Sequence, residues 1–393
     1  MIVENLPVPF DRRVWMESTT LRKAGYQVTV ICPVGKTGKY YDVIDDIAIY
    51  RYPLPSLPGA IGHIVEYGIA VPVTLVLSLW VSLRRGFDVI HVANPPDLFF
   101  VLSWLYRPFG KKFVFDHHDL VPETCETRWT GTTLKVMKTV LSWCERATYG
   151  AADMVVATNE SYKRVAMKRG HKRDADVVVV RSGPLTDKFQ RVPPDPALRH
   201  GRKFLACYLG VMGPNDGLDL LLEIVKHVVY TRKVTDVSFV LMGAGDCFDD
   251  LVRQSEEMGV SDFVTFTGRI PDADVIAHLS TADVGIAPDP RDALNDVSTM
   301  NKIIEYMAVG LPVLSFDLIE ARVSAGEAGE YATANDTLEM ADRLIALLND
   351  PDRRERMRAI GVERVRTTLA WEHQAPKLLG AYQRLIALRA HQP

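Results

Sequence analysis

The chain has 393 residues, 47% of them apolar, and a formal net charge of -3 at pH 7. This length suits two domains of about 150–200 residues each. The apolar content argues against a disordered chain, and the small net charge argues against a dedicated nucleic-acid binder. Residues 1–192 hold 25 Lys and Arg against 19 Asp and Glu. Such a basic half could face anionic lipid or a phosphorylated acceptor, or could be a chance imbalance on solvated faces.

The five cysteines are scattered, and none is in a CxxC pair. They predict reduced thiols in a cytoplasmic protein, with neither a zinc site nor a disulfide framework. The chain opens without a signal peptide: Met1, Ile2 and Val3 resemble the end of a first strand. We expect a cytoplasmic protein that could lie peripherally on the inner membrane face.

In the first half, short apolar runs alternate with helical stretches, which is typical of a parallel, doubly wound sheet. Strands are predicted at residues 27–32, 47–52, 88–92, 112–116, 154–158 and 177–181. Helices are predicted at residues 13–24, 61–83, 98–106, 132–149 and 160–169.

The stretch 68–83 is almost wholly apolar, contains Pro72 and is followed by Arg84 and Arg85. A helix that spans a bilayer needs about 20 residues, so this stretch is marginal. We expect a helix buried against the sheet. A helix that dips into one leaflet and a true span are the alternatives.

The second half repeats the alternation. Strands are predicted at residues 204–209, 237–242, 264–267, 284–287 and 313–316, and helices at 218–230, 248–258, 272–280, 300–309 and 338–348. The Pro- and Gly-rich stretch 182–203 has no apolar period and predicts a linker. Residues 362–368 and 371–389 predict helical structure at the end of the chain.

The predicted fold class is therefore α/β, with two Rossmann-like, doubly wound parallel-sheet domains facing a central cleft. We place an acceptor-side domain at residues 1–185, a linker at 186–203 and a nucleotide-sugar-binding domain at 204–370. Residues 371–393 form an amphipathic helix that we expect to pack across the domain interface.

Two glycine-rich turns follow strands of the second half. Gly243 and Gly245 form a GxG element before a helix, and Gly210 and Gly213 form a similar turn. Glycines there let backbone N–H groups approach a phosphate or ribose. A tight strand-to-helix turn explains the same pattern equally well. No GxxxxGK[ST] element occurs, which excludes a P-loop NTPase.

The segment 295–313 is the richest in polar groups. Ser298 or Thr299 is predicted to cap a helix that begins near Met300, and the first turn of that helix is an anion site. Lys302 is poorly placed there for helix stability, and a bound diphosphate would explain its position. Glu305 could accept from a ribose diol. A surface Lys–Glu pair is the plainer alternative.

Two segments of the first half carry further candidates. His117, His118 and Glu123 follow the strand 112–116, at a strand end where open sheets place their chemistry. A metal site and a structural histidine are the alternatives, although adjacent histidines on an extended loop point apart. Arg12 and Arg13 follow Asp11, the predicted N-cap of the first helix. They could contact phosphates or pair with Asp11 or Glu17.

At these residues the chain resembles the family 4 glycosyltransferases, retaining enzymes of the two-domain GT-B fold. The resemblance runs essentially end to end. Its motifs are PFDRRVW (9–15), FDHHD (115–119), ATNESY (157–162), RSGP (181–184), FTGR (266–269) and STMNKIIEYMAVGLPV (298–313). It implies a nucleotide-diphosphate-sugar donor bound mainly by the second domain and an acceptor on the first, as in bacterial polysaccharide biosynthesis.

The resemblance also assigns roles to residues. His118 matches a histidine that contacts the donor sugar, and Glu305 matches the second Glu of an E-x7-E element that holds the ribose. Lys302 matches a lysine that some members carry. Gly243 and Gly245 match the turn near the nucleotide. The base-contacting loop corresponds to Arg269 and Ile270.

Two departures from the family pattern stand out. Val297 occupies the position of the first Glu of E-x7-E, with Asp296 beside it as a candidate substitute. The usual Arg and Lys that hold the diphosphate align with Val211 and Asp216. Phosphate charge must then be met by Lys302, by N–H groups around Ser298, Thr299, Met300 and Asn301, and by candidates such as Arg12, Arg13 or Arg322.

We expect a glycosyltransferase that moves a sugar to an acceptor hydroxyl with retention, with lipid-linked saccharide as the favoured acceptor. No cofactor and no metal are expected, because the chain offers no aspartate-x-aspartate element set for Mg²⁺. A non-hydrolysing nucleotide-sugar epimerase and an inactive nucleotide-sugar-binding homologue are the alternatives. A dehydrogenase is disfavoured by the lack of a strand–GxGxxG–helix unit with a distal acid.

Overall fold

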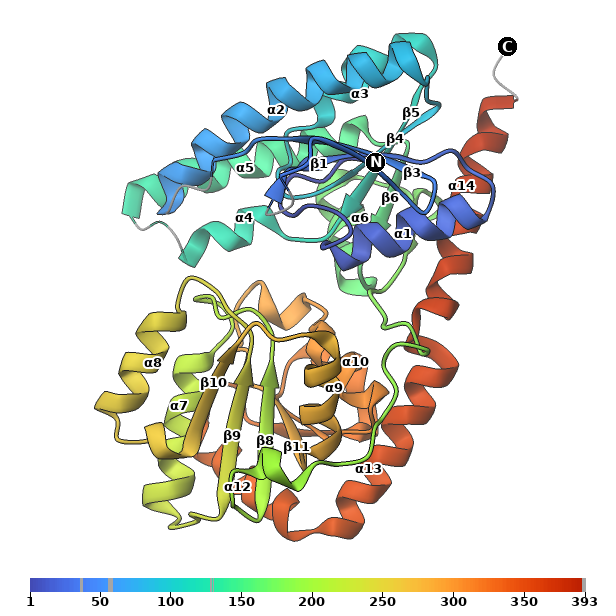
Figure 1. Cartoon of the computed structure of the whole chain (residues 1–393). Coiled ribbons are helices and arrows are strands. Elements are labelled where there is room, and N and C mark those ends of the chain that lie inside the picture. The colour runs from blue at the N-terminus through green and yellow to red at the C-terminus, as the bar shows by residue number, and fades with distance from the viewer. Residues whose placement is uncertain (36–37, 56–58, 128, 130, 391–393) are drawn as a thin grey trace. The chain divides into compact units, whose positions relative to one another are not determined.

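The computed structural model describes residues 1–35, 38–55, 59–127, 129 and 131–390 (Figure 1). The chain forms two compact units, Met1–Arg181 with Gln374–Pro393, and Ser182–His373. Residues 186–203, predicted as a linker, belong to the second unit. Helix α14 (Trp371–Ala390) begins in the second unit and continues in the first.

The first unit is built on two groups of strands. In one, β1 (Thr29–Pro33) pairs in parallel with β3 (Ile47–Tyr52), and β2 (Tyr41–Ile44) is antiparallel to β3. Ile2 bridges the two groups, because it pairs with Ile31 and Val92. The other group is parallel: β4 (Val89–Ala93), β5 (Lys112–His117), β6 (Met154–Ala157) and β7 (Val177–Val179).

Helices connect these strands, and α1 and α6 have side-chain N-caps. Asp11 accepts from the Val14 N–H at 2.9 Å and caps α1, as predicted, and Asn159 accepts from the Tyr162 N–H at 2.7 Å to cap α6. Such caps satisfy N–H groups that a helix start leaves open. The helices are α1 (Arg12–Lys23), α2 (Gly59–Arg84), α3 (Phe100–Tyr106), α4 (Val121–Thr124), α5 (Gly131–Ala151) and α6 (Glu160–Gly170).

The second unit is a six-stranded parallel sheet in the order β10-β9-β8-β11-β12-β13. The order reverses between β8 and β11, and the edge beyond the carboxyl ends of these two strands is where open α/β sheets bind ligands. The strands are β8 (Phe204–Leu209), β9 (Val237–Met242), β10 (Val264–Gly268), β11 (Val284–Ala287), β12 (Val313–Phe316) and β13 (Gly329–Ala332).

The helices of the second unit follow the strands in alternation, as predicted for a doubly wound sheet. They are α7 (Leu218–Lys226), α8 (Phe248–Glu257), α9 (Asp272–Thr281), α10 (Asn301–Ala308), α11 (Ile319–Ala325), α12 (Thr337–Asn349) and α13 (Pro351–Arg364). The sequence prediction missed β2, β13, α4, α11 and most of α13.

The predicted burial of the helix at residues 68–83 is wrong. Val76 and Leu83 of α2 are 63% and 87% exposed. The buried stripe of this helix consists of Ala70, Thr74, Ser78 and Val81. A hydropathy pattern shows that a segment is apolar, but it does not show how many sides of the helix the protein covers.

Candidate functional site

The glycine-rich turns after β8 and β9 lie against each other in the second unit. The Met212 N–H donates to Ala244 O at 3.2 Å, and the Cys247 N–H donates to Met212 O at 2.9 Å. Gly243 has a φ of +146°, and a Cβ on it would lie 1.8 Å from Gly210 O. Only glycine fits such a close approach.

The two turns thereby bring Gly210, Gly213, Gly243 and Gly245 together at the carboxyl edge of the sheet. A Cβ on Gly245 would lie 2.6 Å from Met212 O, and the Gly213 N–H donates to Asp216 Oδ2 at 3.0 Å. Packing between the turns is a sufficient reason for Gly243 and Gly245. The side chain of Val211, in the first of these turns, is 63% exposed.

Lys302 reaches this edge from α10. Its Nζ donates to Asp289 Oδ1 at 2.7 Å and to the Tyr208 hydroxyl at 3.4 Å, and lies 3.8 Å from Asp216 Oδ1. The ammonium also lies 4.7 Å from the centre of the Tyr208 ring. Lys302 is buried, so the simple alternative of a surface Lys–Glu pair is wrong. Its partners come from β8 and from the loops after β8 and β11, on either side of the point where the strand order reverses.

The charges of this group are unusual for an anion site. Burial alone would lower the pKa of Lys302, but Asp289 and then Asp216 outweigh burial and raise it, so the lysine stays protonated. Burial raises the pKa of Asp216, and Lys302 only partly opposes that shift. Asp289 is 1% exposed, and its Oδ2 has no hydrogen-bond partner. Two carboxylates therefore face one ammonium.

The start of α10 differs from the prediction. The N-cap is Met300, whose side chain makes no capping bond, and the helix begins at Asn301. The Ser298 hydroxyl donates to Leu294 O at 2.7 Å instead of capping α10. Asp296 Oδ1 accepts from the Ile319 N–H at 3.0 Å at the start of α11. The first turn of α10 is thus left without a side-chain cap from Met300.

The remaining donor candidates of the second unit differ in their surroundings. Glu305 lies half-buried, one turn beyond Lys302 on α10, and Thr299 precedes the helix. Gly268, at the end of β10, accepts from the Gly243 N–H at 3.0 Å, which brings the neighbouring Arg269 and Ile270 next to the glycine turns. Arg322 donates to Asp317 Oδ2 at 2.9 Å and stacks on the Tyr331 ring.

In the first unit, Asp116 at the end of β5 organises a buried polar cluster. Arg13 Nη2 donates to Asp116 Oδ1 at 2.8 Å and lies 3.1 Å from Glu17 Oε1. His118 Nε2 lies 2.5 Å from Asp116 Oδ2. Arg13 Nε lies 2.9 Å from the same nitrogen and 3.4 Å from Asp116 Oδ2, so its N–H faces both atoms.

The electrostatics of this cluster are dominated by burial. Burial would raise the pKa of Asp116, but Arg13 and then His118 hold it well below its usual range. Burial and the neighbouring Asp116 charge raise the pKa of Glu17 well above its usual range. Burial also lowers the pKa of His91, whose Nδ1 lies 2.7 Å from the Tyr382 hydroxyl. Arg13 thus favours the ionised form of Asp116, whereas burial and the Asp116 charge disfavour the ionised form of Glu17.

The other candidates of the first unit have structural partners. His117 points inward, away from His118, as predicted for adjacent histidines; its Nδ1 lies 3.0 Å from the Tyr149 hydroxyl. Burial, followed by the nearby His118, lowers the pKa of His117 to about 3. Arg169 donates to Glu123 Oε2 at 3.1 Å. Arg12 is exposed at the start of α1.

Glu17, Asp116 and His118 also have the spacing of a metal site, with ligand atoms within 4.8 Å of one another. The Arg13 guanidinium, however, already contacts both carboxylates at 3.1 Å or less. A cation would have to displace this charge, so the residues present do not favour a metal there.

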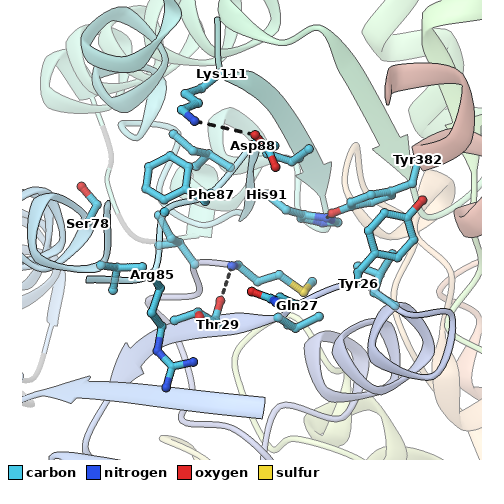
Figure 2. A pocket seen from close by; sticks show the side chains of 18 of the residues that line it. Tyr26, Gln27, Thr29, Ser78, Arg85, Phe87, Asp88, His91, Lys111 and Tyr382 are labelled. Carbon is cyan, nitrogen blue, oxygen red and sulfur yellow. Dashed lines mark hydrogen bonds and ion pairs between the residues drawn. The ribbon is translucent and has the colours of Figure 1, made fainter. Parts of the chain in front are cut away.

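A cavity of about 620 Å³ lies at the opposite end of the first unit's strands (Figure 2). Its walls include Thr29, Asp88 and Lys111, which lie at or just before the amino ends of β1, β4 and β5. Figure 2 shows His91 and Tyr382 side by side among the residues that line it. Open α/β sheets bind ligands beyond the carboxyl ends of strands, so this cavity is not a candidate for the donor.

Sequence comparisons place both units in known families. Residues 11–186 match the family described as Glycosyltransferase Family 4, and residues 203–350 match Glycosyl transferases group 1. A phosphatidyl-myo-inositol mannosyltransferase from Mycobacterium leprae is 29% identical over 96% of this chain and 94% of its own length. A GDP-mannose-dependent alpha-(1-6)-phosphatidylinositol monomannoside mannosyltransferase from Mycobacterium tuberculosis is 29% identical over 57% of this chain and 60% of its own length.

Solved structures agree on the fold. Sucrose-phosphate synthase from Thermosynechococcus elongatus superposes with a TM-score of 0.78 at 18% identity, covering 98% of both chains. HepE from Anabaena in complex with UDP-glucose gives a TM-score of 0.70 at 13% identity, again covering 98% of both. The sequence matches, the end-to-end relatives and the two parallel-sheet units agree: the chain belongs to glycosyltransferase family 4 and has the GT-B fold.

Proposed function

We propose that this glycosyltransferase takes its sugar from a nucleotide-diphosphate donor and transfers it, with retention, to a hydroxyl of a lipid-linked saccharide or other glycan. The observation that carries the proposal is the position of Lys302. Its ammonium is fixed beside the glycine turns at the point where the strand order of the second unit reverses. A positive charge fixed there could stabilise the charge that develops on a leaving nucleoside diphosphate.

The charges around Lys302 must change for a diphosphate to bind there. With Asp289 and Asp216 ionised, the three groups carry a net negative charge, which opposes a diphosphate. The raised pKa of Asp216 offers a remedy, because protonation of this carboxyl on donor binding removes one negative charge. The N–H groups at the first turn of α10 supply the remaining donors, and Glu305 would hold the ribose.

His118 of the first unit is proposed to contact the donor sugar. Asp116 and Arg13 occupy its Nε2, which leaves Nδ1 as the ring atom that would meet a sugar hydroxyl. Arg13 and Asp116 would then act as positioning residues for this ring. We further propose that transfer needs no metal, since Arg13 already supplies the positive charge between the carboxylates of the only metal-like group found among the described residues.

The proposed acceptor is a lipid-linked saccharide, and the proposed location is the cytoplasmic face of a membrane. Several relatives are named for acting on phosphatidylinositol or its mannosides, which supports an acceptor with a lipid anchor. The basic balance of residues 1–192 supports contact with anionic lipid.

Incubation of the purified chain with a panel of nucleotide sugars, including UDP-glucose and GDP-mannose, tests the donor. We expect one donor to raise the melting temperature and to release its nucleoside diphosphate only when a glycan acceptor is added. The anomeric coupling in the product, measured by NMR, should show the configuration of the donor. A product with the opposite anomeric configuration would refute retention. A change of configuration in the donor sugar without any acceptor would favour the epimerase. Donor binding without release of the nucleoside diphosphate would favour the inactive homologue.

A further inference from the structure

Helix α2 turns its more apolar side outward. The stripe that faces the protein includes Thr74 and Ser78, and the Ser78 hydroxyl lies 2.9 Å from the Tyr106 hydroxyl of α3. The opposite stripe carries Val76, Leu79 and Leu83, all exposed. The sequence from residue 68 to residue 83 contains no charged residue. A helix that borders water normally shows the reverse pattern.

Helices α3 and α5 extend this apolar surface. Trp104 of α3 and Trp143 of α5 are 57% and 59% exposed, and both rings pack edge-on against Phe100, at 4.7 and 5.8 Å between centroids. Val136 and Val140 lie on the same outward stripe of α5 as Trp143, at intervals of three and four residues. Figure 1 shows α2, α3 and α5 together in the first unit.

Basic side chains border the apolar surface. Arg84 and Arg85 follow the last turn of the α2 stripe, and the Arg84 guanidinium lies 4.3 Å from the centre of the Trp80 ring. Arg107 follows α3, and Arg146 is exposed on α5. Exposed tryptophans beside arginines are typical of proteins that sit at the boundary between lipid acyl chains and headgroups.

We propose that the outward surface of α2, α3 and α5, with Trp80, Trp104 and Trp143, docks on a membrane that contains anionic lipid. The apolar stripe enters the acyl boundary, and the arginines meet the phosphate headgroups. The segment Val65–Arg84 is long and apolar enough to span a bilayer, with a mean hydropathy of 1.6 and 22% of it buried. Ala70, Thr74, Ser78 and Val81 pack into the unit, so the helix lies on the membrane with one side still on the protein.

This inference deepens the proposed function, because it names the surface that would bring the enzyme to a lipid-linked acceptor. A second copy of the chain is the alternative occupant. The basic border argues against it, since two such surfaces placed face to face would bring like charges together.

Vesicle flotation of the full chain tests the proposal, with vesicles of phosphatidylcholine alone or mixed with phosphatidylglycerol. We expect binding to the mixed vesicles, weakened by salt, and a loss of affinity of about tenfold or more in Leu83→Ser/Trp143→Ser. The matched control is Ile360→Ser/Val362→Ser, which removes two exposed apolar side chains from α13 and should leave binding unchanged. Brominated lipid should quench the tryptophan fluorescence of the wild type more strongly than that of the triple variant Trp80→Phe/Trp104→Phe/Trp143→Phe.

Two outcomes would overturn the proposal. The first is equal flotation of the test and control variants. The second is a wild type that is dimeric and does not float, together with a Leu83→Ser/Trp143→Ser variant that is monomeric. Nucleotide release with a soluble acceptor serves as the second readout. It should be unchanged in both variants, because neither touches the proposed donor residues. Loss of flotation with intact release therefore separates membrane docking from the transfer reaction itself.

Discussion

Replacement of Lys302 separates its structural role from its proposed chemical role. Lys302 and Asp289 are 7% and 1% exposed, and their charged atoms lie 2.7 Å apart. Removal of one partner from a buried ion pair costs about 3–5 kcal/mol. Lys302→Met should therefore lower the melting temperature of the second unit by roughly 6–20 °C, at about 2–4 °C per kcal/mol for a domain of this size.

The same variant should lose transfer activity. A preorganised charged donor at a developing anion is worth about 3 kcal/mol, so kcat/KM should fall by roughly 150-fold. The double variant Lys302→Met/Asp289→Asn removes the stranded carboxylate and should regain much of the lost stability, while its activity stays low. Lys226→Met, which removes an exposed lysine from α7, is the matched control and should change neither quantity.

Thermal unfolding and nucleotide release, measured on the same preparations, check this prediction. If the double variant regains both stability and activity, Lys302 acts only by neutralising Asp289. If Lys302→Met unfolds at the wild-type temperature, the buried pair does not contribute as the geometry indicates.

Further variants test the surrounding residues. Asp216→Asn should tighten donor binding by about fivefold at pH 8, which is roughly 1 kcal/mol for one removed charge. The affinity of the wild type for the donor should fall as pH rises through the raised pKa of Asp216. Calorimetry that finds the same pH dependence of donor affinity in the wild type and the variant would contradict this. Gly243→Ala should abolish donor binding, because its Cβ would meet Gly210 O, whereas Gly150→Ala, with nothing within 4 Å, should stabilise α5 by up to about 1 kcal/mol in urea unfolding. The His117 pKa of about 3 lies below its value in the unfolded chain. Its contribution to stability is therefore present above about pH 6.5 and is lost as pH falls toward 3, at up to about 1.4 kcal/mol per pH unit. His117→Gln should flatten the dependence of the unfolding free energy on pH in this range. Transfer should survive EDTA, and restoration by Mg²⁺ of a rate lost to EDTA would refute the metal-free proposal.

The sequence predicts the regular elements better than the contacts between them. Short, largely apolar runs marked β8, β9, β11 and β12, and their alternation with helices predicted the doubly wound sheets. Helix α13 was largely missed because its first turns, PDRRERMR, are mostly charged and show no apolar stripe. Strand β2 was missed because it is only four residues long and is nowhere buried.

The candidate site residues can be named from the sequence, but their mutual geometry cannot. The position of Lys302 near a helix start was readable from the sequence, whereas Asp289 and Asp216, its partners, come from two loops that only the parallel sheet brings together. In the same way, Arg13 and Asp116 are 103 residues apart and meet only in the folded first unit. Long-range pairing of this kind leaves no local signal in the sequence.

The most direct test is a crystal structure of the full chain with its nucleotide-sugar donor or the corresponding nucleoside diphosphate. We predict pyrophosphate oxygens within about 3 Å of Lys302 Nζ and of N–H groups in the first turn of α10, with the ribose at Glu305. A pyrophosphate bound elsewhere, with Lys302 still held by Asp289 alone, would contradict the account.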